Sequence, residues 1–118
     1  MKNFSSKLSA SQQAERLLPP QRRVKAVLDT DAYNEIDDQF AILYAMLSPE
    51  KIDLQAIYAA LFYNGRSSSP ADGMEKSYQE ILKICGLTGR DPEGFVFRGC
   101  RAPLEGPELP QESEAVND

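Results

Sequence analysis

Four aspartates that could do chemistry together lie in residues 29–38: Asp29, Asp31, Asp37 and Asp38. Carboxylates this close repel one another as anions, so they favour a bound cation or a shared proton. Carboxylate oxygens are the ligands that Ca²⁺ and Mg²⁺ prefer, and a carboxylate can also take a proton from water. The cluster therefore predicts a cation-assisted or acid–base site.

The elements that position these aspartates are predicted from hydrophobic spacing. The apolar run over residues 24–29 predicts a strand, and residues 37–47 are expected to form a helix. The helix is indicated by apolar side chains at i, i+3, i+4 and i+7: Phe40, Leu43, Tyr44 and Leu47. Asp29 and Asp31 would then stand at the carboxyl end of the strand, where open α/β sheets bind ligands. Asp37 is expected to cap the facing helix.

The rest of the chain continues the alternation of strands and helices. Strands are predicted over residues 52–61 and 95–97. The helix between them is expected to begin with Ser69 as its cap and Pro70 as its first residue, and to stop at Gly86. The order β-α-β-α-β indicates an α/β fold, the start of an open, mostly parallel, Rossmann-like sheet.

Composition divides the chain into three parts. Residues 1–23 form a basic appendage with a short helix over residues 12–18, residues 24–104 form the α/β body, and residues 105–118 form an acidic tail ending in the first turn of a helix. The net charge of −5 and the lack of a basic stripe argue against nucleic acid as a partner. No stretch is long enough for a membrane span. These features are typical of a cytoplasmic protein.

The predicted topology leaves one side of the sheet bare. If the strands lie in sequential order, right-handed crossovers put both helices on the same face. Val27, Ala56 and Tyr58 would then be uncovered on the other face. Leaving several such side chains exposed to water costs several kcal/mol of stability, at roughly 25 cal/mol per Å² of apolar surface. We therefore expect the chain to be an incomplete fold that needs a C-terminal half, or to pair with a second copy.

The pattern of residues 24–47 resembles the opening of the inosine–uridine-preferring nucleoside hydrolases. That family begins with an apolar strand, D-x-D, a short loop, then D-D and an apolar helix. The resemblance extends over residues 24–104 and includes further landmarks: the helix end at Ser48-Pro49-Glu50, Asn64 just past the second strand, and Pro103-Leu104 after the third. The resemblance implies a nucleoside as substrate.

The resemblance also implies a role for each residue. Asp31 and Asp38 would bind Ca²⁺, and Asp31 would activate the attacking water. Asp37 would hydrogen-bond a ribose hydroxyl, Asn64 would contact the sugar or the metal's surroundings, and Asp29 would orient the others from behind. Cleavage of an N-glycosidic bond passes through an oxocarbenium-like sugar, which nearby anions stabilise. The expected reaction is nucleoside plus water giving ribose and free base.

The loop between the aspartates departs from the family pattern. Residues 31–36 are two residues longer than the usual loop and lack its glycine, and Glu35 adds a carboxylate. The sequence therefore resembles a divergent branch, and the preferred base and sugar stay open. The family's leaving-group acid is a histidine, and this chain has none. We expect the 118-residue chain alone to be an incomplete or inactive fragment.

Two alternatives stay open from the sequence. A strand followed by Asp29-Thr30-Asp31 also resembles the haloacid-dehalogenase-like phosphatases, in which the first aspartate is the nucleophile beside Mg²⁺. That pattern does not account for Asp37 and Asp38. The other alternative is a non-catalytic module that binds a ribosyl ligand or a protein. Calcium dependence together with turnover would separate the hydrolase from the module.

Overall fold

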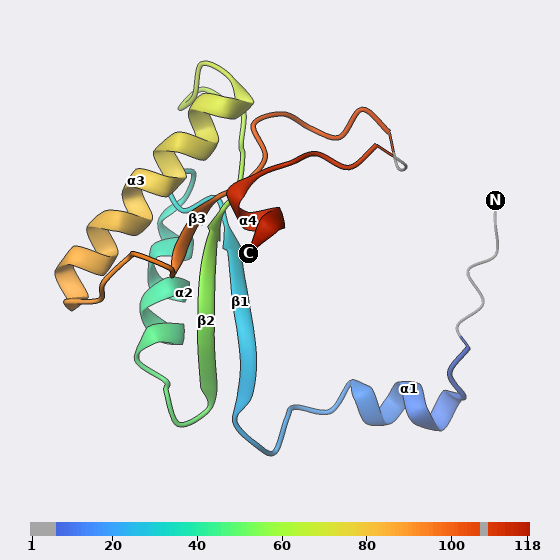
Figure 1. Cartoon of the computed structure of the whole chain (residues 1–118). Coiled ribbons are helices and arrows are strands. Elements are labelled where there is room, and N and C mark those ends of the chain that lie inside the picture. Colours follow the sequence, from blue (N-terminus) through green and yellow to red (C-terminus); the bar gives the residue numbers. More distant parts are fainter. Residues whose placement is uncertain (1–6, 107–108) are drawn as a thin grey trace.

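A computed structural model describes residues 7–106 and 109–118 of the chain. The element order confirms the predicted α/β alternation, and a short helix lies on either side of it in the chain (Figure 1). The elements are α1 (Ala10–Arg16), β1 (Val24–Thr30), α2 (Ile36–Met46), β2 (Ile52–Ala59), α3 (Pro70–Thr88), β3 (Val96–Arg98) and α4 (Glu114–Asn117).

The three strands form a parallel sheet in the order β1-β2-β3. Ala26 pairs with Leu54 and Val27 with Ala56, so Gln55 is an extra residue that bulges out of β2. Beyond the bulge, Asp29 pairs with Tyr58. Because all strands run the same way, their carboxyl ends and the loops that follow them meet at one edge of the sheet.

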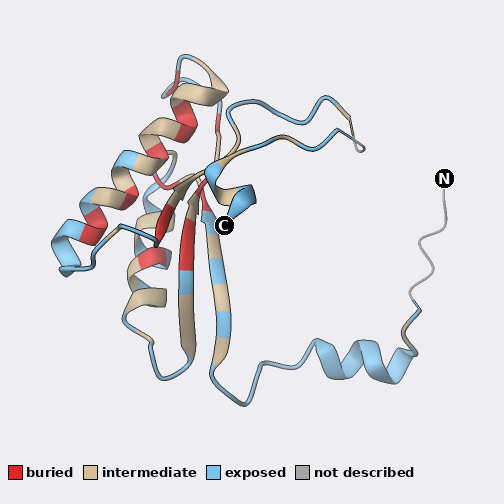
Figure 2. Ribbon diagram, in the orientation of Figure 1, coloured by how far each residue is buried: buried red, intermediate tan, exposed pale blue. Residues whose placement is uncertain are grey.

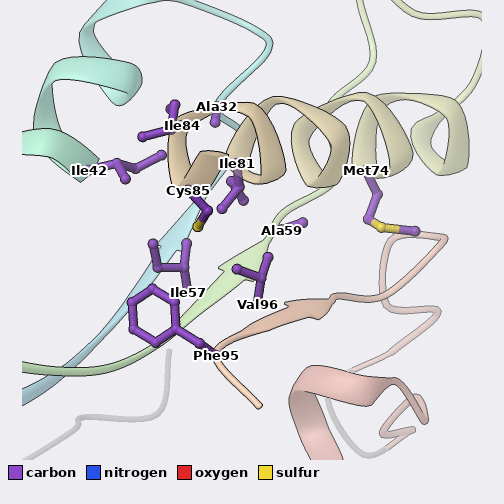
Figure 3. Packing of buried hydrophobic residues seen from close by; sticks show 10 residues of the cluster. All are labelled: Ala32, Ile42, Ile57, Ala59, Met74, Ile81, Ile84, Cys85, Phe95 and Val96. Atoms are coloured by element: carbon purple, nitrogen blue, oxygen red, sulfur yellow. The ribbon is translucent and has the colours of Figure 1, made fainter. Parts of the chain in front are cut away.

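Helices α2 and α3 cover the same face of the sheet, as sequential strand order requires (Figure 1). A core of aliphatic side chains, one methionine, one cysteine and one phenylalanine lies between the helices and the strands (Figure 3). Burial of this cluster from water is the main force that holds both helices to the sheet. Its fully buried side chains include Ile42, Ile57, Met74, Ile81 and Cys85.

The opposite face, which we call the open face, is covered by no long helix in the described chain (Figures 1 and 2). Val27 on this face is 53% exposed. Tyr58 and Phe97 contact each other edge to face, with ring centroids 6.0 Å apart. The prediction that Ala56 is uncovered is wrong, since it is 2% exposed. Ala56 belongs to β2, the central strand, which has β1 on one side and β3 on the other.

Several boundaries differ from the prediction. Helix α1 spans Ala10–Arg16 instead of residues 12–18, and β2 ends at Ala59, two residues before its predicted end. The N-cap of α2 is Glu35, not Asp37, because the helix already begins at Ile36. Helix α3 begins as predicted, with the Ser69 side chain accepting from the backbone N–H of Asp72. It does not stop at Gly86, but continues to Thr88 and ends at Gly89, whose φ of 71° suits the left-handed cap.

The helices at the two ends of the described chain are short. In α1, Ser9 is the cap and Gln12 completes a capping box, but no residue of the helix is buried. In α4, Ser113 is the cap, which confirms the predicted first turn of a helix there. None of the helices in the part of the chain that the structure describes has the length and apolar character needed to cross a membrane.

Candidate functional site

The loops after β1 and β2 come together at the carboxyl edge of the sheet. Asn34 donates from Nδ2 to Asp31 Oδ2 over 3.0 Å, and its Oδ1 accepts from Asn64 Nδ2 over 2.5 Å. Arg66 NH1 donates to the carbonyl oxygen of Asn34 over 2.5 Å. The structure therefore brings Asp31 and Asn64, two of the predicted site residues, into one hydrogen-bonded network.

Asn34 is fixed at both its backbone and its side chain. Its backbone N–H donates to the Asp31 carbonyl oxygen over 2.7 Å, which closes a tight turn in the β1–α2 loop. On the other loop, the Asn64 Oδ1 accepts from the backbone N–H of Arg66. Each asparagine thus orders its own loop and also contacts the other, so the two loops are positioned as one unit.

Asp38 is aimed back at the end of β1. Its Oδ1 accepts from the hydroxyl of Thr30 over 2.5 Å, and Thr30 is 4% exposed. The bond holds one oxygen of Asp38 at the carboxyl edge of the sheet, on the side covered by the helices. Asp37 is exposed in the first turn of α2, and Glu35 is exposed just before it.

Asp29 lies apart from Asp38. The burial of β1 alternates, so Lys25, Val27 and Asp29 face the open side, whereas Thr30 faces the helices. Burial raises the pKa of the Asp29 carboxyl, and the negative charge of Asp31 raises it further. Asp29 is thus close enough to Asp31 to feel its charge, while its side chain projects on the other side of the sheet.

The carboxylates of Asp31 and Asp38 are oxygen ligands of the kind that a hard cation prefers, but they are fewer than such a cation needs. Oδ2 of Asp31 and Oδ1 of Asp38 each accept one hydrogen bond, which leaves a second oxygen on each side chain. Ca²⁺ takes six to eight oxygen ligands. Among the described residues, no group of three or more His, Cys, Asp or Glu side chains is arranged to hold a metal ion.

Three residues of this site were not predicted from the sequence: Thr30, Asn34 and Arg66. Asp31 and Asn34 are three residues apart, a spacing typical of a turn in which Asp and Asn side chains bond to nearby groups. This spacing could have predicted the contact between Asn34 and Asp31. Nothing local indicates that Thr30 contacts Asp38, or that Arg66 contacts Asn34 from 32 positions away. Those contacts depend on how the loops meet.

Comparison with known proteins found no match: no protein-family model, curated protein or solved structure is similar to this chain beyond chance.

Replacing Asn34 with alanine should loosen both loops. The change removes two side-chain hydrogen bonds of a partly buried network, so we expect a loss of about 1–2 kcal/mol in the free energy of unfolding. Urea unfolding measures this loss, and amide NMR shifts should change at Asp31 and Asn64. The control is Glu35→Ala in the same loop, which makes no capping bond and should change stability by less than about 0.5 kcal/mol. Equal effects of the two variants would contradict a bridging role for Asn34.

Proposed function

We propose that this chain carries the water-activating and sugar-binding part of a calcium-dependent hydrolase of ribonucleoside N-glycosidic bonds. The observation that supports this most is the joining of Asp31 to Asn64 through Asn34, while Thr30 holds Asp38 at the same sheet edge. Asp31 and Asn64 come from two separate loops. Asp31, Asp38 and Asn64 are also residues for which the sequence resemblance predicts roles.

In this proposal, Asp31 is the base. One of its oxygens is fixed by Asn34, and the other takes a proton from the water that attacks the sugar. Asp37, exposed on the first turn of α2, accepts hydrogen bonds from a ribose hydroxyl. Asn64 orients the sugar through its amide. As the bond to the base breaks, the sugar gains positive charge, which the surrounding carboxylates stabilise.

Asp31 and Asp38 are the residues that would hold the calcium ion. When bound, the ion would supply positive charge that orients water and offsets the repulsion between the two carboxylates. Thr30 contributes by donating to Asp38, which fixes the carboxylate in position before any cation arrives.

The proposal assigns only part of a reaction to these residues. The departing base needs a proton, and the sequence contains no histidine to give it. We therefore expect the chain by itself to release little free ribose from inosine or uridine. Rapid turnover by the purified 118-residue chain would mean that another of its own groups protonates the base.

Calcium binding tests the proposal most directly. Titration calorimetry on the whole chain should detect binding, and the pair Asp31→Ala with Asp38→Ala should weaken it at least about tenfold, or about 1.4 kcal/mol. The matched control is Glu35→Ala with Asp91→Ala, which removes the same charge from exposed positions. If both double variants weaken calcium binding equally, the loss comes from the lower negative charge of the whole chain and not from Asp31 and Asp38. Unchanged binding after loss of Asp31 and Asp38 would refute the assignment.

A further inference from the structure

A cavity of about 400 Å³ lies between the open face of the sheet and α4, near the carboxyl ends of the strands. This volume is within the range of about 300–1,000 Å³ for small-molecule sites. Its walls come from all three strands or the segments after them and from α4. The lining residues that the argument uses are Asp29, Tyr58, Gly99, Ala115 and Val116.

Small residues line part of the sheet side of the cavity, together with Tyr58, Leu61 and Cys100. At Gly99 a side chain cannot be added, since a Cβ would lie 2.4 Å from the carbonyl oxygen of Ala59. Ala60 adds little bulk beside it. Tyr58 contributes an aromatic ring that is already packed against Phe97. These surfaces favour a flat, largely apolar ligand.

Helix α4 forms the outer wall through Ser113, Ala115 and Val116. An ion pair and two hydrogen bonds hold it in place, and in the ion pair Arg98 Nη1 lies 3.6 Å from Glu114 Oε1. The backbone N–H of Arg98 donates to Glu114 Oε2 over 3.0 Å. The Tyr58 hydroxyl donates to Asp118 Oδ2 over 3.0 Å. Helix α4 is therefore bonded to both β2 and β3, and these contacts hold the outer wall of the cavity beside the sheet.

The charges around the cavity select the kind of ligand. Among the residues that line it, Asp29 is the one with a carboxylate. Asp118 is the C-cap of α4, and Glu114 in α4 is paired with Arg98, which also makes a two-pronged contact with Glu75. An anionic ligand would meet the carboxylates of Asp29 and Asp118 here, so a neutral molecule with a hydrogen-bond donor is favoured.

We infer that this cavity binds a small neutral aromatic or heteroaromatic molecule bearing an N–H group, which donates to the Asp29 carboxylate while the ring packs between Tyr58 and α4. The site needs neither calcium nor Asp38. It is therefore independent of the proposed hydrolase activity and can be tested in the presence of a chelator.

The test is an amide NMR titration of the full chain in EDTA, with indole as the probe and 1-methylindole as its donor-free partner. Indole should shift the amides of Asp29, Gly99 and Val116, and should bind about tenfold more tightly than 1-methylindole. In Asp29→Leu, which keeps size but removes the acceptor, the two probes should bind equally. Asp53→Asn, an acid at the far end of β2, should leave the tenfold preference intact.

A second variant tests the place of binding. Ala115→Phe should fill the cavity and abolish the indole shifts, and the same spectra report whether the chain stays folded. If Ala115→Phe does not fold, the test is the loss, in Asp29→Leu, of the preference for indole over 1-methylindole. Absence of indole binding, shifts confined to residues outside the cavity, or an unchanged preference in Asp29→Leu would each overturn the inference.

Discussion

Gly73→Ala is expected to destabilise the protein by about 3 kcal/mol, at the upper end of the usual cost of overpacking a core. Gly73 is buried in the first turns of α3, and a Cβ there would lie 2.0 Å from the carbonyl oxygen of Phe62. Its next neighbours are the backbone C and N of Phe62, each at 2.9 Å. Because the obstruction is backbone, no change of rotamer relieves it, and the helix or the loop must move.

Gly86→Ala is the matched control in the same helix. A Cβ at Gly86 meets nothing within 4 Å, and the residue is exposed. Alanine forms helix better than glycine, so this variant should gain about 0.5–1 kcal/mol. Urea unfolding of both variants and the parent measures the contrast. Similar changes in the two variants would show that helix propensity, and not the contact with Phe62, governs Gly73.

The Gly73 contact also positions the candidate site. Phe62 is buried and lies two residues before Asn64, so close approach of α3 fixes the segment that carries this asparagine. The hydroxyl of Ser67 donates to the Phe62 carbonyl oxygen and closes the same loop. We therefore expect Gly73→Ala to disturb the bond between Asn34 and Asn64 even in molecules that stay folded.

Local sequence signals predicted the elements well. Strand β1 follows from its apolar run, and the start of α3 follows from Ser69 and Pro70, whose side chains act within one turn of their own backbone. Coverage of one sheet face by both helices follows from the handedness of the crossovers once the strands lie in sequential order. Each of these features depends on short-range chemistry or on a general rule of chain connection.

Features set by tertiary contacts were not predicted. Gly86 has the residue type of a helix stop, but a helix ends where the left-handed cap can form, and that position is Gly89. The four aspartates lie within ten residues of one another, yet Asp29 projects on the open face while Asp38 bonds to Thr30. Successive side chains of a strand point to opposite faces of the sheet, so Asp29 and Thr30 face opposite sides although they are neighbours in sequence. Which loops then meet depends on distant residues such as Asn64.

Arg98→Met is expected to destabilise the protein by about 2 kcal/mol at about pH 7, after allowing for partial exposure of the charged groups. Arg98 donates from Nε and NH2 to the two oxygens of Glu75, over 2.8 and 3.2 Å. Its guanidinium also lies 3.7 Å above the ring of Tyr78, a cation–π contact. Methionine keeps much of the aliphatic stem and loses these contacts. Together they tie the end of β3 to α3.

The loss should depend on pH in a definite direction. The Arg98 guanidinium holds the pKa of Glu75 below its ordinary value. A carboxyl with a lowered folded-state pKa stabilises the protein above its unfolded pKa of about 4.3, and that contribution disappears as pH falls through the folded-state value. The gap between parent and Arg98→Met should therefore be widest near neutral pH and should narrow below about pH 4, as Glu75 gains its proton.

Urea unfolding of parent and variant at about pH 7 and about pH 3 measures both effects. Arg101→Met is the control, since Arg101 is exposed and also lies just after β3; it should change stability by less than about 0.5 kcal/mol. A gap for Arg98→Met that stays constant with pH would mean that packing on Tyr78, and not the charge pair with Glu75, supplies the stability. Because the Arg98 backbone N–H also donates to Glu114, the variant reveals as well whether the side chain is needed to keep α4 beside the open face.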